Sequence, residues 1–124
     1  MSRKFLYGDL TQKIIISTRT IFDELGYGHP EKVYQKALQK DLLKQKIPFK
    51  RESYSKILYD GEVVGRYFLD FLIDDRVAVE LKVRREIYEN DWIQLLNYLK
   101  AKELKVGLLI VFMKSGVAVK RLMN

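Results

Sequence analysis

Charged residues interrupt an apolar strand pattern in residues 70–82, which read DFLIDDRVAVELK. Apolar residues alternate on both sides of an acidic turn, as is typical of two strands that form a hairpin. A three-residue turn pairs Ile73 with Val77 and keeps one face wholly apolar, whereas a two-residue turn does not. The same register places Asp70 opposite Glu80. Two like charges in a cross-strand pair are destabilising, so a positive charge is expected between them.

Glu80 and Lys82 lie two residues apart, so their side chains point to the same side of the strand. Magnesium prefers oxygen ligands, which Asp70, Glu80 and the carbonyl of Leu81 would provide. Such a metal would stabilise charge on a phosphate and activate a water, and Lys82 would orient that water or neutralise the transition state. The alternative is a solvated strand on which Glu80 and Lys82 form an ordinary ion pair. The apolar surroundings and the opposed Asp70 favour the site.

Composition narrows the class of protein. A chain of 124 residues with 48% hydrophobic and 31% charged residues predicts one globular domain over residues 1–124. The absence of cysteine excludes disulfides and thiolate metal sites, and it fits a cytoplasmic location. The start, MSRKFLYGDL, lacks the apolar core of a secretion signal, and no apolar run reaches membrane-spanning length. A net charge of +7 is compatible with a nucleic-acid partner.

Periodicity predicts an α/β sheet sandwiched by helices, in the order α-α-β-β-β-α-β-β. The first helix is expected over residues 10–25, with Asp9 or Thr11 as its cap and Gly26 as its end. Two more helices are expected from Pro30 to about residue 45 and from residue 87 or 88 to residue 102. The extended segments are expected at residues 49–59, 62–70, 77–83, 106–112 and 117–122, with Asp60-Gly61 as a hairpin turn.

Several further polar residues are candidates for the site, each with an ordinary alternative. Glu31 lies at the edge of the buried stripe of its helix, where it would either reach the sheet or complement the helix dipole. Gln94 and Tyr98 lie one turn apart on the third helix and would bind a phosphate, position the lysine, or merely line a surface. The candidate phosphate-steering charges, which are otherwise solvated, are Arg84, Arg85, Lys44, Lys46, Lys50 and Arg51.

Taken together, these residues resemble the PD-(D/E)XK nuclease superfamily, and specifically its small GxxExxY family. The naming motif is present as GHPEKVY in residues 28–34, which includes Glu31 and Tyr34. The acid and the E-x-K motif of the superfamily are present as Asp70 and residues 80–82, and its Q-x-x-x-Y helix as residues 94–98. The resemblance implies a mixed central β-sheet flanked by helices, a restriction-endonuclease-like core. It also implies a metal site of Glu31, Asp70, Glu80 and Lys82, flanked by Gln94 and Tyr98.

The first functional hypothesis is therefore a nuclease that uses Mg²⁺ or Mn²⁺ to hydrolyse phosphodiester bonds, in DNA more than in RNA. Asp70 and Glu80 would bind the metal, Lys82 would assist the water, and Glu31 would complete the acidic cluster. Tyr34 and Arg84 would support substrate binding. The alternative is a non-catalytic nucleic-acid-binding or assembly module with the same fold. A structural homo-oligomer is a third hypothesis, and a homodimer or a protein partner is compatible with the first two.

Overall fold

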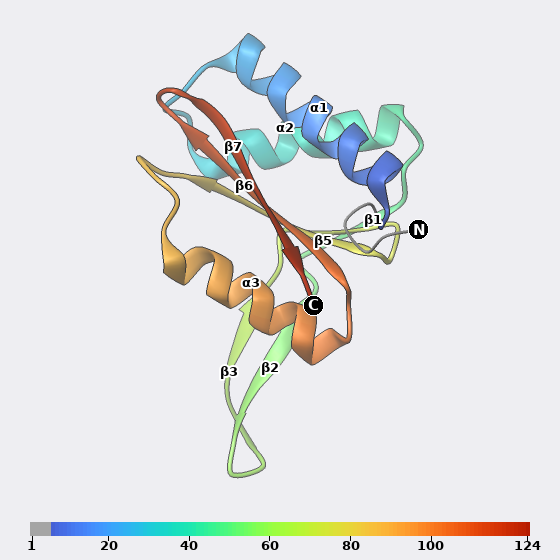
Figure 1. The fold of residues 1–124 in the computed structure, drawn as a ribbon, viewed down its shortest axis with the longest axis vertical. Coiled ribbons are helices and arrows are strands. Elements are labelled where there is room, and N and C mark those ends of the chain that lie inside the picture. The colour runs from blue at the N-terminus through green and yellow to red at the C-terminus, as the bar shows by residue number, and fades with distance from the viewer. Residues whose placement is uncertain (1–5) are drawn as a thin grey trace.

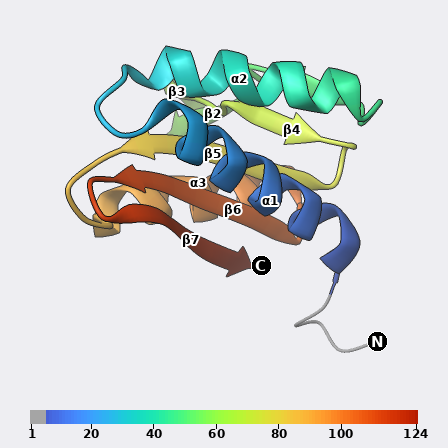
Figure 2. The same ribbon diagram turned by 90° about the horizontal axis from the view of Figure 1, so that it is seen from above.

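The computed structural model describes residues 6–124, in which a central sheet lies between two helical layers (Figures 1 and 2). The helices are α1 (Gly8–Leu25), α2 (Glu31–Lys44) and α3 (Glu89–Lys102). The strands are β1 (Phe49–Arg51), β2 (Tyr54–Tyr59), β3 (Glu62–Phe68), β4 (Phe71–Ile73), β5 (Val77–Val83), β6 (Val106–Met113) and β7 (Gly116–Met123). The five-stranded sheet has the order β1-β4-β5-β6-β7, and β2 and β3 form a separate hairpin. Helices α1 and α2 cover one face and α3 covers the other, which confirms the predicted α/β fold.

The register of β4 and β5 is the one that the three-residue turn predicts. Phe71 pairs with Val79, and Ile73 pairs with Val77, in an antiparallel ladder. All four side chains are buried in the core that α1 and α2 cover. Ala78 points to the opposite face and is buried in the core that α3 covers. Strand β5 is therefore a central strand with two apolar faces, into which Glu80 brings a carboxylate.

Strand β6 confirms the buried strand that the continuous apolar run predicts. It pairs in parallel with β5 and antiparallel with β7, so the sheet is mixed. Helix α3 makes the crossover between the two parallel strands and packs closely on Gly107. A Cβ added at Gly107 would lie 3.1 Å from Cδ1 of Leu99 and 3.4 Å from Cδ2 of Leu95. The missing side chain thus lets α3 approach the face of the sheet that also carries Glu80.

The segment predicted as one strand from Glu62 to Asp70 is two strands in two sheets. Strand β3 ends at Phe68 and β4 begins at Phe71. Oδ2 of Asp70 accepts a hydrogen bond from the Leu81 amide at 2.8 Å, so a side chain replaces a strand partner where the chain changes sheets. Residues 49–59 are likewise divided into β1, which pairs with β4, and β2, which pairs with β3. The observed order is α-α-β-β-β-β-β-α-β-β.

The helix ends agree with the sequence only in part. Gly26 ends α1 with a φ of 75°, which glycine adopts readily. The candidate caps Asp9 and Thr11 are wrong, because both lie within the first turn and Tyr7 occupies the N-cap position. Helix α3 begins at Glu89. Within residues 6–124, no helix is long and apolar enough to cross a membrane. The predictions of one domain over residues 1–124 and of no secretion signal include residues 1–5, which lie outside the described part.

Candidate active site

The carboxylates of Asp70 and Glu80 meet where β3 gives way to β4. The backbone amide of Asp70 donates a hydrogen bond to Oε1 of Glu80 at 3.0 Å. In return, the amide of Leu81 donates to Oδ2 of Asp70 at 2.8 Å. The side chain of Glu80 therefore binds the backbone of Asp70, and the side chain of Asp70 binds the backbone next to Glu80. This exchange is expected from the register, which places the two residues opposite each other. These contacts hold two carboxylates together at one edge of the core.

A second set of contacts, from α2 and β1, fixes the orientation of Asp70. The amide of Gln35 on α2 donates to Oδ1 of Asp70 at 3.1 Å. Arg51 on β1 donates to the Asp70 carbonyl at 2.8 Å, to Gln35 at 3.1 Å and to Gln39 at 2.9 Å. The guanidinium of Arg51 also lies 4.4 Å from the centre of the Phe71 ring. Asp70 is thus held from three elements, which limits the positions that its carboxylate can adopt.

Glu80 is almost completely buried, with 3% of its surface exposed. The hydroxyl of Tyr67 on β3 donates to its Oε2 at 2.7 Å. Burial, followed by the charge of Asp70, raises the pKa of Glu80 to about 8. The hydroxyl of Tyr67 and the charge of Lys82 act in the opposite direction. Burial and the neighbouring Glu80 also raise the pKa of Tyr67. A proton or a metal cation would therefore stabilise this pair.

Lys82 lies between two acids that come from different layers of the fold. Its Nζ is 3.9 Å from Oε1 of Glu31 and 3.9 Å from Oε2 of Glu80. Glu31 is the first residue of α2, which Pro30 precedes as the N-cap. Proline has a suitable backbone angle at a helix start and carries no amide hydrogen that needs a partner there. This start brings the Glu31 carboxylate beside β5, where it contacts Lys82.

Tyr34 is buried beneath the loop that leads into α2. Its hydroxyl donates to the carbonyl of Gly26, and its ring stacks on Phe112 with a centroid distance of 4.1 Å. The ring of His29 packs edge-on against Tyr34, with centroids 5.9 Å apart. Tyr34 therefore contacts the sheet and the loop that precedes Glu31. The next residue, Gln35, is the one that binds Asp70. The position of Tyr34 in the structure is that of a residue that orients the start of α2.

The residues expected to flank the acids lie at different distances from them. Tyr98 is buried, and its ring lies 5.9 Å from that of Tyr67, which binds Glu80. Burial raises the pKa of Tyr98. Gln94 is exposed on α3, and within residues 6–124 it makes no hydrogen bond to either acid. The structure thus brings Tyr98 to the second layer around the acidic pair but leaves Gln94 outside it.

Arg84 follows β5 and binds the start of α3. Its Nε lies 3.0 Å from Oδ2 of Asp91, and its second terminal nitrogen lies 3.3 Å from Oδ1. The Asp91 side chain is 9% exposed and that of Arg84 is 31% exposed, so the carboxylate is shielded from water while the guanidinium is partly solvated. The hydrogen bond that Arg84 donates to Asp91 raises the pKa of Arg84. Arg84 therefore fastens α3 to the end of β5, which leaves less of its guanidinium for a phosphate.

The donor set at Asp70 and Glu80 fits a hard divalent cation in its chemistry. Each of the four carboxylate oxygens accepts one hydrogen bond, and an oxygen of this kind has a second lone pair. The raised pKa of Glu80 also indicates a place where positive charge is needed. Among the described residues, no three His, Cys, Asp or Glu side chains form a group that could hold a metal. The site is accordingly a pair of carboxylates, with Glu31 on the far side of Lys82.

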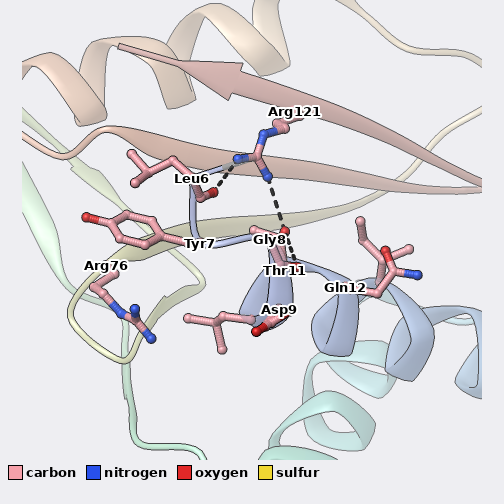
Figure 3. Close-up of a pocket in the computed structure, with 10 residues that line it drawn as sticks. Leu6, Tyr7, Gly8, Asp9, Thr11, Gln12, Arg76 and Arg121 are labelled. Carbon is pink, nitrogen blue, oxygen red and sulfur yellow. Dashed lines mark hydrogen bonds between the residues drawn. The ribbon is translucent and has the colours of Figure 1, made fainter. Parts of the chain in front are cut away.

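A separate pocket of about 890 Å³ lies at the start of α1 (Figure 3). Tyr7, Arg76 and Arg121 contribute to its lining. Arg121 donates to the hydroxyl of Thr11 at 3.1 Å and to the carbonyl of Leu6. Neither Asp70 nor Glu80 lines this pocket. A search by cavity size would therefore miss these two acids, which are recognised by the burial of Glu80 and by the second carboxylate beside it.

The architecture is the restriction-endonuclease-like fold: a mixed sheet between helices. The model of the PD-(D/E)XK nuclease superfamily matches residues 8–122, and the chain belongs to this superfamily. The crystal structure of a protein named SSO0001 has a similar fold, with a TM-score of 0.59 and 18% sequence identity. The alignment covers 98% of this chain and 61% of that one, so this chain spans about three-fifths of the SSO0001 chain. Comparison with curated proteins gives no match.

Three residues that contact the acids were not expected there from the sequence. Tyr67 reads as an ordinary strand tyrosine, and Arg51 reads as one of several solvated charges. Gln35 lies one helical turn from Glu31, which is the only sequence signal that points it toward the site. The contacts of all three depend on how α2, β1 and β3 converge, and the sequence pattern does not show that convergence.

Proposed function

We propose that this chain is a metal-dependent nuclease that hydrolyses phosphodiester bonds, with DNA as its expected substrate. The observation that carries the proposal is the contact of the half-buried Asp70 with the buried Glu80, together with Lys82 Nζ 3.9 Å from Glu80. An ordinary core would not contain this arrangement, because burial and a neighbouring negative charge both disfavour an ionised carboxylate. Membership of a nuclease superfamily supports the same conclusion.

In this proposal, Asp70, Glu80 and the Leu81 carbonyl hold Mg²⁺ or Mn²⁺. When bound, the metal supplies charge stabilisation for the phosphate and a water of lowered pKa. Glu80 must lose its proton to act as a ligand, and a cation between the two carboxylates favours that loss. Lys82 holds a proton on Nζ and directs it toward the phosphate or the attacking water. Glu31, whose Oε1 lies 3.9 Å from Nζ, orients the ammonium of Lys82.

We also infer that the chain is a member of the GxxExxY family. The motif spans the α1–α2 loop and the first turn of α2, where each named residue has a structural task. Gly28 has a φ of 102°, a value that glycine tolerates and other residues rarely adopt. Tyr34 packs under that loop, and Glu31 contacts Lys82. The motif thus places one carboxylate beside the E-x-K lysine, which supports Glu31 as part of the proposed site.

The remaining roles follow from position. Tyr98 supports Glu80 through Tyr67, whereas Gln94 and Arg84 lie on the α3 side and are proposed to contact substrate phosphates. A homodimer or a protein partner is also within the proposal. A homodimer would supply a second acidic pair for the opposite strand of a duplex.

A second candidate is a nucleic-acid-binding module without catalysis. One observation favours it: Lys82 lies between Glu31 and Glu80, so the protein itself supplies some of the positive charge that a metal would provide. Such a module would bind through its basic residues with a strong salt dependence and would have no metal affinity at Asp70 and Glu80.

Cleavage by matched variants separates the two candidates. The panel consists of supercoiled plasmid, linear duplex, single-stranded DNA, branched junctions and structured RNA, each with Mg²⁺ or Mn²⁺. Wild type and the exposed control Lys105→Ala should cut at equal rates, whereas Lys82→Ala should not cut. Binding without cutting by wild type across the panel would favour the binding module. Equal cutting by Lys82→Ala and wild type would show that the site is elsewhere.

A further inference from the structure

The hairpin of β2 and β3 extends away from the central sheet and presents an uncovered face (Figure 1). Cross-strand pairing places Tyr54 opposite Phe68, Lys56 opposite Arg66 and Leu58 opposite Val63. Tyr54, Lys56 and Leu58 lie two apart on β2 and share a face, as do Phe68 and Arg66 on β3, whereas Val63 joins this face as the partner of Leu58 beyond a shift of the register. These six residues are here called the outer face. All six are exposed. The opposite face of the hairpin is the one that meets the protein body, through Ser55 and Tyr67.

The aromatic and basic residues of the outer face form a compact group. The rings of Tyr54 and Phe68 lie 5.4 Å apart, with exposed fractions of 41% and 55%. The guanidinium of Arg66 lies 5.8 Å from the centre of the Tyr54 ring. Exposed aromatic rings beside cations are the combination that binds unpaired bases by stacking while contacting their phosphates. Bases in a duplex cannot stack in this way, because neighbouring pairs cover their faces.

The charges of the outer face point to a polyanion. Lys56 and Arg66 face each other directly across the ladder, and like charges in that position are destabilising. Within residues 6–124, neither forms an ion pair with an acid. The acidic residues of the hairpin, Asp60 and Glu62, lie at its turn. A phosphate backbone would neutralise the facing cations, whereas an apolar partner or a second copy of this face would not.

A groove of about 810 Å³ continues the outer face toward α3. Its lining includes Tyr54, Lys56 and, from α3, Lys102, together with Glu52 and Ser53. The side chain of Ser53 lies close enough to the hydroxyl of Tyr98 to lower its pKa, against the rise caused by burial. Tyr98 in turn packs on Tyr67, whose hydroxyl binds Glu80, so the groove is connected to the acidic pair through two tyrosines.

We propose that the outer face of the β2–β3 hairpin binds an unpaired DNA strand and leads it to the acidic pair. The proposal rests on the proposed nuclease function for its choice of DNA, and it narrows the substrate to DNA with unpaired nucleotides. Tyr54 and Phe68 stack on bases, while Lys56 and Arg66 contact phosphates. The chain leaves β3 at Phe68 and reaches Asp70 two residues later. DNA bound on the outer face therefore lies close along the chain to one of the two acids.

The test is binding in EDTA, which does not require cleavage. Fluorescence anisotropy of a labelled poly-thymidine strand compares wild type with Tyr54→Ser/Phe68→Ser and with Lys56→Gln/Arg66→Gln. The aromatic variant should lose at least about thirtyfold in affinity, because two stacking rings are removed, and its salt slope should stay that of wild type, because no charge is changed. The basic variant should lower the slope of log affinity against log salt by about 1.4, the value for two phosphate contacts on a single strand.

Matched controls keep the result specific. Tyr59→Ser removes a 74% exposed tyrosine from the opposite face of the same hairpin, and Lys36→Gln/Lys40→Gln removes two exposed charges from α2. The Tyr59 control should bind as wild type does, and the α2 control should keep the salt slope. Circular dichroism confirms that each variant is folded. Duplex DNA should bind more weakly than the single strand, and the aromatic change should leave that binding unaltered.

Several outcomes would overturn the proposal. These are equal single-strand affinity for wild type and the aromatic variant, binding of RNA but not of DNA, or a wild-type dimer that the aromatic variant converts to a monomer. Failure of the nuclease function is a separate result. If wild type binds the strand through this face and does not cut it with Mn²⁺, the binding role of the outer face is supported and the nuclease function is not. If the aromatic variant binds and cuts as wild type does, the nuclease function is supported and the binding role of the outer face is not.

Discussion

The backbone amide of Asp70 donates a hydrogen bond to Oε1 of Glu80 at 3.0 Å, which joins a half-buried acid to a buried one. A fold would normally avoid this arrangement, because burial and mutual repulsion both penalise the ionised forms. The chain retains it at the point where the β3 strand leaves one sheet and β4 enters another. The energetic cost is concentrated on Glu80, whose pKa is raised to about 8.

The first prediction concerns the pH dependence of stability in EDTA. The pKa of Glu80 is about 8 in the folded state, against an ordinary value of 4.5, so the folded protein binds this proton more tightly than the unfolded chain. The stability that this proton contributes is therefore complete below pH 4.5 and is lost as the pH rises to about 8. Relative to Glu80→Gln, wild type should lose on the order of a few kcal/mol across that interval.

Urea unfolding of both proteins at several pH values measures this difference. Glu86→Gln, which changes an exposed glutamate, is the control and should follow wild type. Parallel curves for wild type and Glu80→Gln would show that Glu80 does not hold a raised pKa in the folded protein.

The second prediction concerns metal binding. A cation that binds only the folded protein raises its melting temperature. Mn²⁺ should therefore raise the Tm of wild type, most strongly above pH 8, where Glu80 is ionised. Asp70→Asn should lose most of this rise, while Asp75→Asn, at an exposed acid in the β4–β5 turn, should keep it. An equal rise in Asp70→Asn would place the metal at another site. Differential scanning calorimetry with and without Mn²⁺ makes the measurement.

The third prediction concerns the pair of Arg84 and Asp91. Asp91 is buried, so Arg84→Ala leaves a carboxylate without its partner at the start of α3. The free energy of unfolding should fall by about 1–3 kcal/mol, because the buried carboxylate loses its hydrogen-bond partner although Arg84 itself is partly exposed. Arg85→Ala, at the exposed neighbour, should change stability little. If Arg84→Ala is as stable as wild type yet binds DNA less tightly, the main role of Arg84 is phosphate binding.

The fold was predictable where one physical requirement decided the answer. Only the three-residue turn keeps Phe71, Val77 and Val79 on one face, so the register of β4 and β5 followed from the sequence. The change of sheet between β3 and β4 did not follow, because the apolar alternation continues through it. At this point the side chain of Asp70, which lies between β3 and β4, accepts a hydrogen bond from the Leu81 amide on β5, and such a tertiary contact leaves no mark in the apolar pattern.

The candidate site shows the same division. Glu80 and Lys82 lie two apart on one strand, so their proximity is a property of strand geometry and could be predicted. Gln35, Arg51 and Tyr67 reach the acids from three other elements, and their contacts depend on tertiary packing. The catalytic and metal-binding roles assigned to the acids and to Lys82 stay predictions until activity is measured.

The fourth prediction concerns the hydroxyl of Tyr67. Its hydrogen bond favours the ionised form of Glu80, so Tyr67→Phe should raise the pKa of Glu80 further. Because Glu80 must be ionised to bind a cation, Mn²⁺ binding should require a higher pH in the variant. Titration calorimetry as a function of pH measures this shift, and Tyr88→Phe, at an exposed tyrosine, is the control. An unchanged pH dependence would mean that the Tyr67 hydroxyl does not act on the ionisation of Glu80.

The last prediction concerns Arg51 as a residue that positions Asp70. Its three hydrogen bonds need the planar fork of a guanidinium, so Arg51→Lys keeps the charge but loses the geometry. Residues that orient metal ligands typically contribute about ten- to a hundredfold to metal affinity or activity. Arg51→Lys and Gln35→Ala should therefore weaken Mn²⁺ binding and lower kcat with little change in KM. Lys50→Ala, at the exposed neighbour, should do neither. A rise in KM at constant kcat would instead assign Arg51 to substrate binding, because a positioning role acts on the reacting centre and not on affinity for DNA.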